Sequence, residues 1–130
     1  MNGRRLACAI LSRRWVTLMS HERRRLVERV SFVTSPGYGD GSSQWRKQNR
    51  LLGGGPAAII TTLGVLRFPD EGGEAFLAST HPGHTVEQVR AETGWDLKVA
   101  EHVSETAPPT ESELSAIRRF DPDGFWTRPT

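Results

Sequence analysis

A run of small and apolar residues from Ala57 to Phe68 limits the folds open to this chain more than any other stretch. Gly53-Gly54-Gly55-Pro56 precedes the run, and Pro69-Asp70-Glu71-Gly72-Gly73 follows it. Twelve residues with a single charge are typical of a strand covered on both faces. Gly64 predicts either one bent strand or two strands that separate at this glycine. After the second turn, the segment 74–80 is expected to return antiparallel and complete a hairpin.

The residues before the triple glycine divide into shorter pieces. The β-rich segment 15–19 predicts a strand. In the segment 26–33 the β-branched content favours a strand, while three apolar residues also fit a helical stripe. We expect a strand there. The segment 34–50 predicts a loop, and a compact domain seldom keeps a loop of this length unless it serves a site or an interface.

Two capped helices are expected in the second half of the chain. Thr85 with Gln88 forms a capping box, and Gly94 occupies the position where a left-handed residue ends a helix. A short strand is predicted at 97–100. A second capping box, Thr110 with Glu113, begins a final helix that ends at 121–124. Its predicted apolar stripe consists of Leu114, Ile117 and Phe120.

Length, charge and cysteine content narrow the class of protein. The 130 residues are expected to form one domain, preceded by an atypical N-terminal extension at 1–14. A single cysteine, Cys8, excludes a disulfide framework within the chain and favours a cytoplasmic location. The longest nearly uncharged stretch, 51–66, is too short to cross a membrane. The net charge is +8 over residues 1–50 and −6 over residues 51–130, so phosphate-bearing partners are expected at the N-terminal half.

The glycine-rich segments allow two interpretations. Gly53-Gly54-Gly55-Pro56 lacks the Lys-Ser or Lys-Thr that follows a nucleotide P-loop, and Gly37 to Gly41 lacks the spacing of a dinucleotide fingerprint. Both segments fit ordinary turn chemistry. The triple glycine also leaves backbone amides that could approach a thioester or a carboxylate closely.

Other groups of reactive side chains favour structural roles. His81-Pro82-Gly83-His84 predicts a turn, and its spacing predicts no metal site. No Gly-x-Ser-x-Gly elbow is present, so a serine nucleophile is not expected. Arg23-Arg24-Arg25 predicts a solvated rim or a subunit contact, with a phosphate site for CoA as the alternative. Without aromatic platforms or a recognised nucleic-acid-binding fold, nucleic acid is not an expected partner.

Three segments carry more specific information than any single glycine or histidine. They are HERRRLVERVSFVTSPG at 21–37, GGGPAAIITTLGV at 53–65 and ASTHPGHTVEQVRAETG at 78–94. In this order they resemble the beta subunit of class I CoA-transferases, of the glutaconate CoA-transferase type. That group includes relatives that hydrolyse a ring-derived CoA thioester in steroid degradation. The resemblance implies an α/β fold of the CoA-transferase type, a mixed β-sheet flanked by short helices, with 15–130 forming the C-terminal part of an incomplete domain.

The resemblance also implies a reaction. CoA would pass between a short or dicarboxylic acyl-CoA and an acceptor acid through a glutamyl-CoA intermediate, with an alpha subunit as partner in a hetero-oligomer. No glutamate here stands in the family's nucleophile motif, so no catalytic residue is assigned within this chain. The candidate substrate-binding backbone is Gly53, Gly54, Gly55 and Pro56. CoA thioester is expected as substrate, and no cofactor is expected to be permanently bound.

Other functions remain open from the sequence. A beta subunit of a ring-opening hydrolase in steroid degradation is one alternative, and a catalytically inert interaction module is another. A small nucleic-acid binder built on the basic half is a third. No membrane partner is expected.

Overall fold

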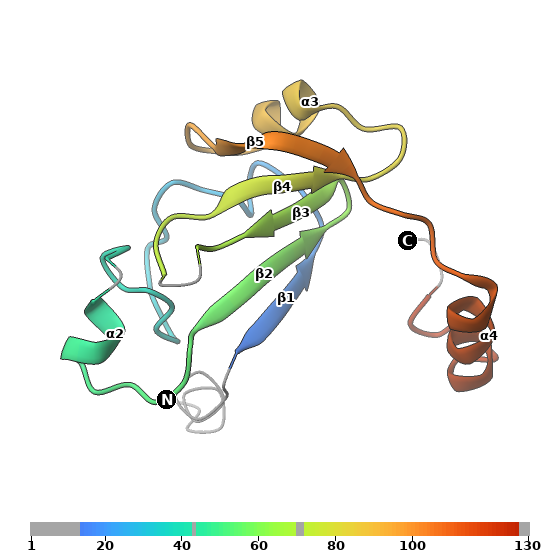
Figure 1. The fold of residues 1–130 in the computed structure, drawn as a ribbon, viewed down its shortest axis with the longest axis horizontal. Coiled ribbons are helices and arrows are strands. Elements are labelled where there is room, and N and C mark those ends of the chain that lie inside the picture. The colour runs from blue at the N-terminus through green and yellow to red at the C-terminus, as the bar shows by residue number, and fades with distance from the viewer. Residues whose placement is uncertain (1–13, 43, 70–71, 128–130) are drawn as a thin grey trace.

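The computed structural model describes residues 14–42, 44–69 and 72–127. Its centre is a five-stranded sheet in which the strands follow chain order (Figure 1). The strands are β1 (Trp15–Met19), β2 (Pro56–Thr61), β3 (Gly64–Arg67), β4 (Phe76–Thr80) and β5 (Lys98–Glu105). The pairs β1–β2 and β4–β5 are parallel, and the two pairs between them are antiparallel. The predicted α/β class with a mixed sheet and short helices is confirmed.

The apolar run after the triple glycine forms two strands rather than one bent strand. Thr61 ends β2, and its Oγ1 lies 3.1 Å from Gly64 N and 2.8 Å from Gly64 O, which closes the turn between β2 and β3. Gly64 itself must be small, because a Cβ there would lie 2.5 Å from Ser79 O on β4. At the next turn, Gly72 N donates to Pro69 O at 2.9 Å. The predicted antiparallel return is confirmed by β4.

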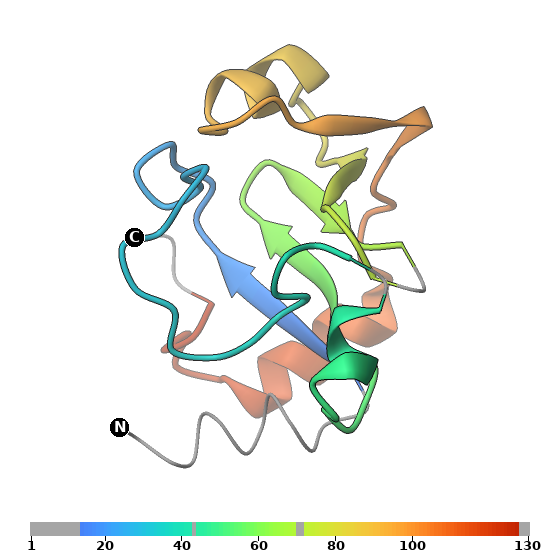
Figure 2. The same ribbon diagram turned by 90° about the vertical axis from the view of Figure 1, so that its left-hand side faces the viewer.

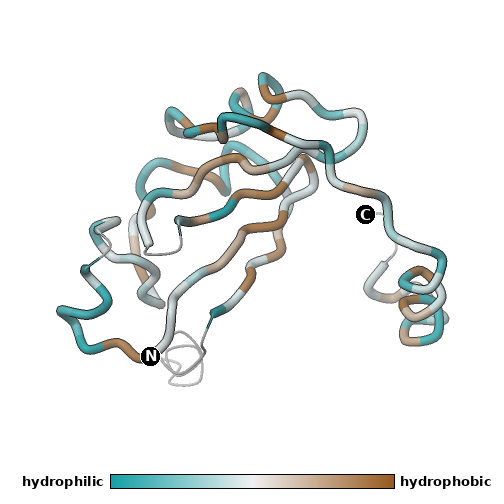
Figure 3. The backbone as a smooth tube through the Cα atoms, viewed as in Figure 1, coloured by the Kyte–Doolittle hydropathy of each residue, from teal (hydrophilic) through white to brown (hydrophobic). Residues whose placement is uncertain are grey.

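The core lies between the sheet and α3 (Val86–Ala91), the helix in the crossover from β4 to β5. Figure 2 shows α3 on the β4–β5 side of the molecule. The capping box of Thr85 and Gln88 that begins α3 is confirmed. Figure 3 shows the apolar residues concentrated along the strands. The buried core cluster consists of Leu66, Ala75, Leu77, Val89 and Leu97.

The strand expected at 26–33 is wrong. Leu26 is buried and Val27 forms an isolated bridge with Gly94, but Phe32 and Val33 are 74% and 67% exposed. β-Branched content needs a partner strand before it forms a ladder, and only one residue of this segment finds one. The expectation that Gly94 ends α3 in a left-handed conformation is also wrong, since its φ is not positive.

Two further boundaries differ from those expected. The predicted loop at 34–50 contains a short helix, α2 (Trp45–Gln48). The strand expected at 97–100 continues to Glu105 as β5. The predicted extension at 1–14 lies almost wholly outside the described residues. Of the described helices, none combines the length and the apolar character that a membrane crossing requires.

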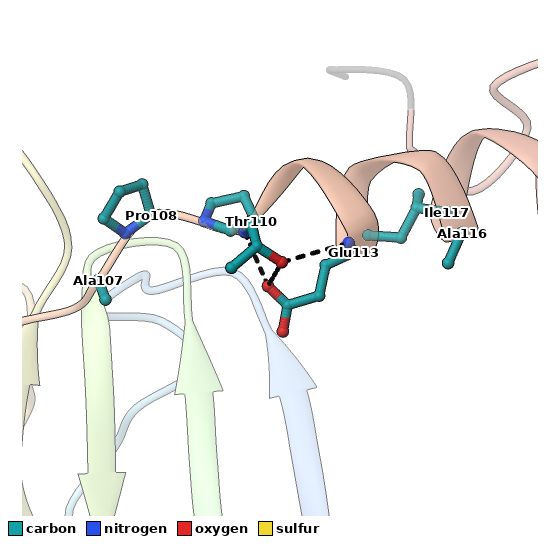
Figure 4. A pocket seen from close by; sticks show the side chains of 7 residues that line it. Ala107, Pro108, Thr110, Glu113, Ala116 and Ile117 are labelled. Atoms are coloured by element: carbon teal, nitrogen blue, oxygen red, sulfur yellow. Dashed lines mark hydrogen bonds between the residues drawn. The ribbon is translucent and has the colours of Figure 1, made fainter.

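The last helix, α4 (Glu111–Phe120), stands clear of the sheet (Figure 1). Thr110 and Glu113 form the predicted capping box, which Figure 4 shows beside Ala107 and Pro108 of the preceding linker. The helix buries none of its residues against the described chain, and Phe120 is 81% exposed. The apolar stripe is therefore present but does not contribute to the core.

Candidate functional site

The triple glycine connects α2 to β2. Gly53 and Gly55 have φ of 82° and 83°, in the left-handed region that favours glycine. Gly55 is buried, whereas Gly53 and Gly54 are exposed. Pro56 opens β2 opposite Trp15 of β1. The segment therefore has an exposed part at its first two glycines and a packed part where it enters the sheet.

Tyr38 lies beneath this segment. Its hydroxyl donates toward the carbonyl oxygens of Gly54 at 2.8 Å and Pro56 at 2.9 Å. The ring is buried and lies 5.4 Å from the ring of Phe68. A Cβ on Gly55 would lie 2.9 Å from Cε1 of Tyr38, so the tyrosine ring occupies the space that a side chain would need.

Arg46 of α2 holds the other end of the segment. Its guanidinium donates to the carbonyl oxygens of Gly37 at 2.8 Å, Leu52 at 3.2 Å and Gly53 at 3.3 Å. The residue is only 5% exposed, and its guanidinium carbon lies 5.4 Å from the ring centroid of Trp15. A buried guanidinium is costly unless its N–H groups find acceptors, and backbone carbonyls supply them here.

Tyr38 and Arg46 were not predicted as site residues from the sequence. Tyr38 is the only tyrosine of the chain and lies between two glycines, which is the one local signal that could have drawn attention to it. Arg46 resembles any other arginine of the basic half. Its role depends on carbonyl groups that only the folded loop brings together.

A surface hollow of about 690 Å³ adjoins this region. It is lined by the loop 33–39 and by Trp45 of α2. Tyr38 takes part both in the lining and in the contact with Gly54, so the hollow and the triple glycine share one wall residue. The loop expected to be too long for a connector thus packs beside the candidate site.

The arginine run after β1 has partners within the chain. Arg23 donates to the carbonyl oxygens of Ala91 at 2.9 Å and Thr93 at 3.2 Å. Arg24 and Arg25 both pair with Glu22, and the hydrogen bonds from Arg24, then Arg25, lower the pKa of that carboxyl group. These contacts fit a solvated rim better than a dedicated phosphate site.

Two histidines close the end of the sheet at which β2 and β4 finish. Nδ1 of the buried His21 lies 2.9 Å from Thr61 Oγ1, and Nε2 of His81 donates to Thr61 O at 2.9 Å. Burial lowers the pKa of His21 below its ordinary value, although the Val89 carbonyl opposes this shift. Within residues 14–42, 44–69 and 72–127, no three His, Cys, Asp or Glu side chains are grouped to hold a metal ion.

Known sequences match this chain over most of its length. The coenzyme A transferase family model matches residues 5–92. The chain is 45% identical over 105 residues to the beta subunit of 3-oxoadipate CoA-transferase from Pseudomonas knackmussii, covering 80% of this chain and 40% of that protein. It is 36% identical over 94 residues to the beta subunit of glutaconate CoA-transferase from Acidaminococcus fermentans, covering 72% of this chain and 35% of that protein.

Solved structures match the fold. Glutaconate coenzyme A-transferase from Acidaminococcus fermentans gives a TM-score of 0.82 at 30% identity, covering 98% of this chain and 49% of that chain. The decarboxylase AibA/AibB gives a TM-score of 0.62 at 27% identity, covering 85% of this chain and 39% of that chain. The chain spans less than half the length of each of these relatives. The predicted resemblance is confirmed, and the chain belongs to the coenzyme A transferase family.

Proposed function

We propose that this chain forms part of a beta-type CoA-transferase subunit and works together with an alpha-type subunit. In this proposal CoA passes between a short or dicarboxylic acyl-CoA and an acceptor acid. Both sequence relatives are named for dicarboxylic acids and as one subunit of a larger enzyme, which supports this substrate class and a heteromeric assembly. A reducing, cytoplasmic setting fits a chain with a single cysteine.

The observation that carries the proposal is the fixed backbone of the triple glycine. Acyl transfer develops negative charge on the carbonyl oxygen, and fixed backbone N–H groups stabilise that charge. The segment offers such groups at Gly53, Gly54 and Gly55 without side chains in front of them. Pro56 has no N–H, and its carbonyl accepts from Tyr38, so its part is to end the segment and start β2.

The proposed reaction needs a carboxylate nucleophile from outside this chain. A glutamate carboxylate would attack the thioester carbonyl and expel the CoA thiolate, which leaves an acyl-glutamyl anhydride. The thiolate would then attack the glutamyl carbonyl, release the acid and form a glutamyl thioester. Residues of this chain would orient the acyl oxygen and would not form the covalent bond. CoA enters as a substrate in this scheme and not as a resident cofactor.

Co-expression tests the proposal. We would express this chain with the adjacent CoA-transferase subunit genes of its own genome and assay the purified complex with acetyl-CoA plus glutaconate or 3-oxoadipate. Formation of the acid's CoA ester is expected. CoA release that is independent of the acceptor acid would instead favour the hydrolase alternative. A stable complex that neither transfers nor releases CoA would contradict the proposal and favour the inert interaction module.

A further inference from the structure

Three consecutive carbonyl groups of the triple-glycine segment face side chains of the preceding loop and of α2. The Arg46 guanidinium donates to Leu52 O at 3.2 Å and to Gly53 O at 3.3 Å. The Tyr38 hydroxyl donates to Gly54 O at 2.8 Å. Two buried side chains thus fix the carbonyl groups from Leu52 to Gly54.

This arrangement determines where the next amides point. In a trans peptide the C=O and the following N–H lie on opposite sides of the bond, and the described chain contains no cis peptide. When Leu52 O and Gly53 O face Arg46, the N–H groups of Gly53 and Gly54 face away from Arg46. When Gly54 O faces Tyr38, the N–H of Gly55 faces away from Tyr38. None of these three amides donates to a residue that the structure describes.

The glycines alone would not hold this geometry. Glycine samples both signs of φ freely, so three in a row would otherwise be the most mobile part of the loop. Here φ is positive at Gly53 and Gly55 but not at Gly54. Alternating backbone conformations of this kind let successive N–H groups form an anion-binding concavity. Fixing them in advance removes an ordering cost from ligand binding.

We propose that Tyr38 and Arg46 are positioning residues, which hold the amides of Gly53, Gly54 and Gly55 as a preformed set of donors for an acyl oxyanion. The inference rests on the proposed function and identifies what orders the site. The ligand chemistry is a carboxylate or thioester oxygen. Arg46 acts through the backbone, because its buried guanidinium is occupied by carbonyl oxygens.

The test uses Tyr38→Phe, which removes only the hydroxyl and keeps the ring that packs on Phe68. Asn49→Ala is the matched control, because Asn49 is exposed next to α2 and its side chain donates to Trp45 O at 2.9 Å, away from the triple glycine. In the reconstituted complex, Tyr38→Phe is expected to lower kcat about 10- to 100-fold, on the order of a weakened oxyanion donor. KM for acetyl-CoA should stay within about 2-fold, and Asn49→Ala should match the wild type.

A second readout does not need activity. In the ¹⁵N-labelled full chain, sodium acetate and acetyl-CoA are expected to shift the amide signals of residues 53–55, and Tyr38→Phe should lose this response while its other signals persist. A wild-type chain whose residues 53–55 do not respond, or a Tyr38→Phe chain that responds like the wild type, overturns the inference. If the amides respond as expected but the complex transfers no CoA, the positioning role stands and the proposed function fails.

Discussion

Two neighbouring glycines of the candidate site are expected to respond to substitution in opposite ways. Gly55 has a φ of 83°, and a Cβ there would meet Tyr38 at 2.9 Å. Gly55→Ala should therefore lower the free energy of unfolding by about 1–3 kcal/mol, because a left-handed residue with a side chain is strained. Urea titration followed by circular dichroism measures this change.

Gly54 is exposed and its φ is not positive, so a side chain there meets no comparable strain. Gly54→Val is expected to change the free energy of unfolding by less than about 1 kcal/mol, within the range of surface substitutions. It should abolish CoA transfer by the reconstituted complex, because a branched side chain would cover the neighbouring amides. Loss of folding in Gly54→Val would show that the segment is only a turn.

Gly94 shows why the reason for a single glycine is hard to obtain from sequence. Its place after a capped helix predicted a left-handed end to α3, but its φ is not positive. A Cβ on Gly94 would lie 2.5 Å from Leu26 O, and Gly94 N donates to that oxygen at 2.7 Å. The requirement comes from a backbone far away in the sequence. Tyr38 and Arg46 escaped prediction for the same reason, since their partners are carbonyl groups that any residue could supply.

The two capping boxes are alike in sequence and should differ in consequence. Thr85 begins α3, whose Val89 is fully buried in the core, whereas Thr110 begins α4, which buries no residue. Removing a cap costs about 1 kcal/mol of helix stability. Thr85→Ala should lower the melting temperature of the whole chain. Thr110→Ala should leave that temperature unchanged and increase amide hydrogen exchange in α4 alone, because stability is not uniform along the chain.

Hydrogen exchange measured by mass spectrometry, together with thermal melting of both variants, checks this pair. Equal loss of melting temperature in Thr85→Ala and Thr110→Ala would contradict the separation of α4 from the core. The same contrast explains which elements could be predicted. Caps and the hairpin turns are local and were found, but the segment 26–33 needed a neighbouring strand that the sequence could not supply.

The molecule as a whole exposes apolar side chains in two places. On β1, Val16 and Leu18 are 52% and 76% exposed, and beside α4 the aromatic pair Phe125 and Trp126 is 76% and 77% exposed. The pair is held in an edge-to-face contact at 4.8 Å, and Asp121 accepts hydrogen bonds from the backbone N–H of both residues. Large exposed apolar groups in fixed positions mark contact surfaces. An edge strand without charged side chains also invites pairing with another chain.

We therefore expect the chain on its own to associate at micromolar concentration and to elute well above its 14.5 kDa in size-exclusion chromatography with light scattering. Leu18→Lys on β1 and Phe120→Lys on α4 should each lower the average mass, because a charge opposes burial of these surfaces. Ser115→Lys is the matched control: it places the same charge on an exposed residue of α4 outside the apolar stripe, and the mass should not change. A monodisperse monomer of the unaltered chain would contradict the expectation, since these side chains would then need no partner. Association that resists both lysine substitutions would place the contact elsewhere on the molecule.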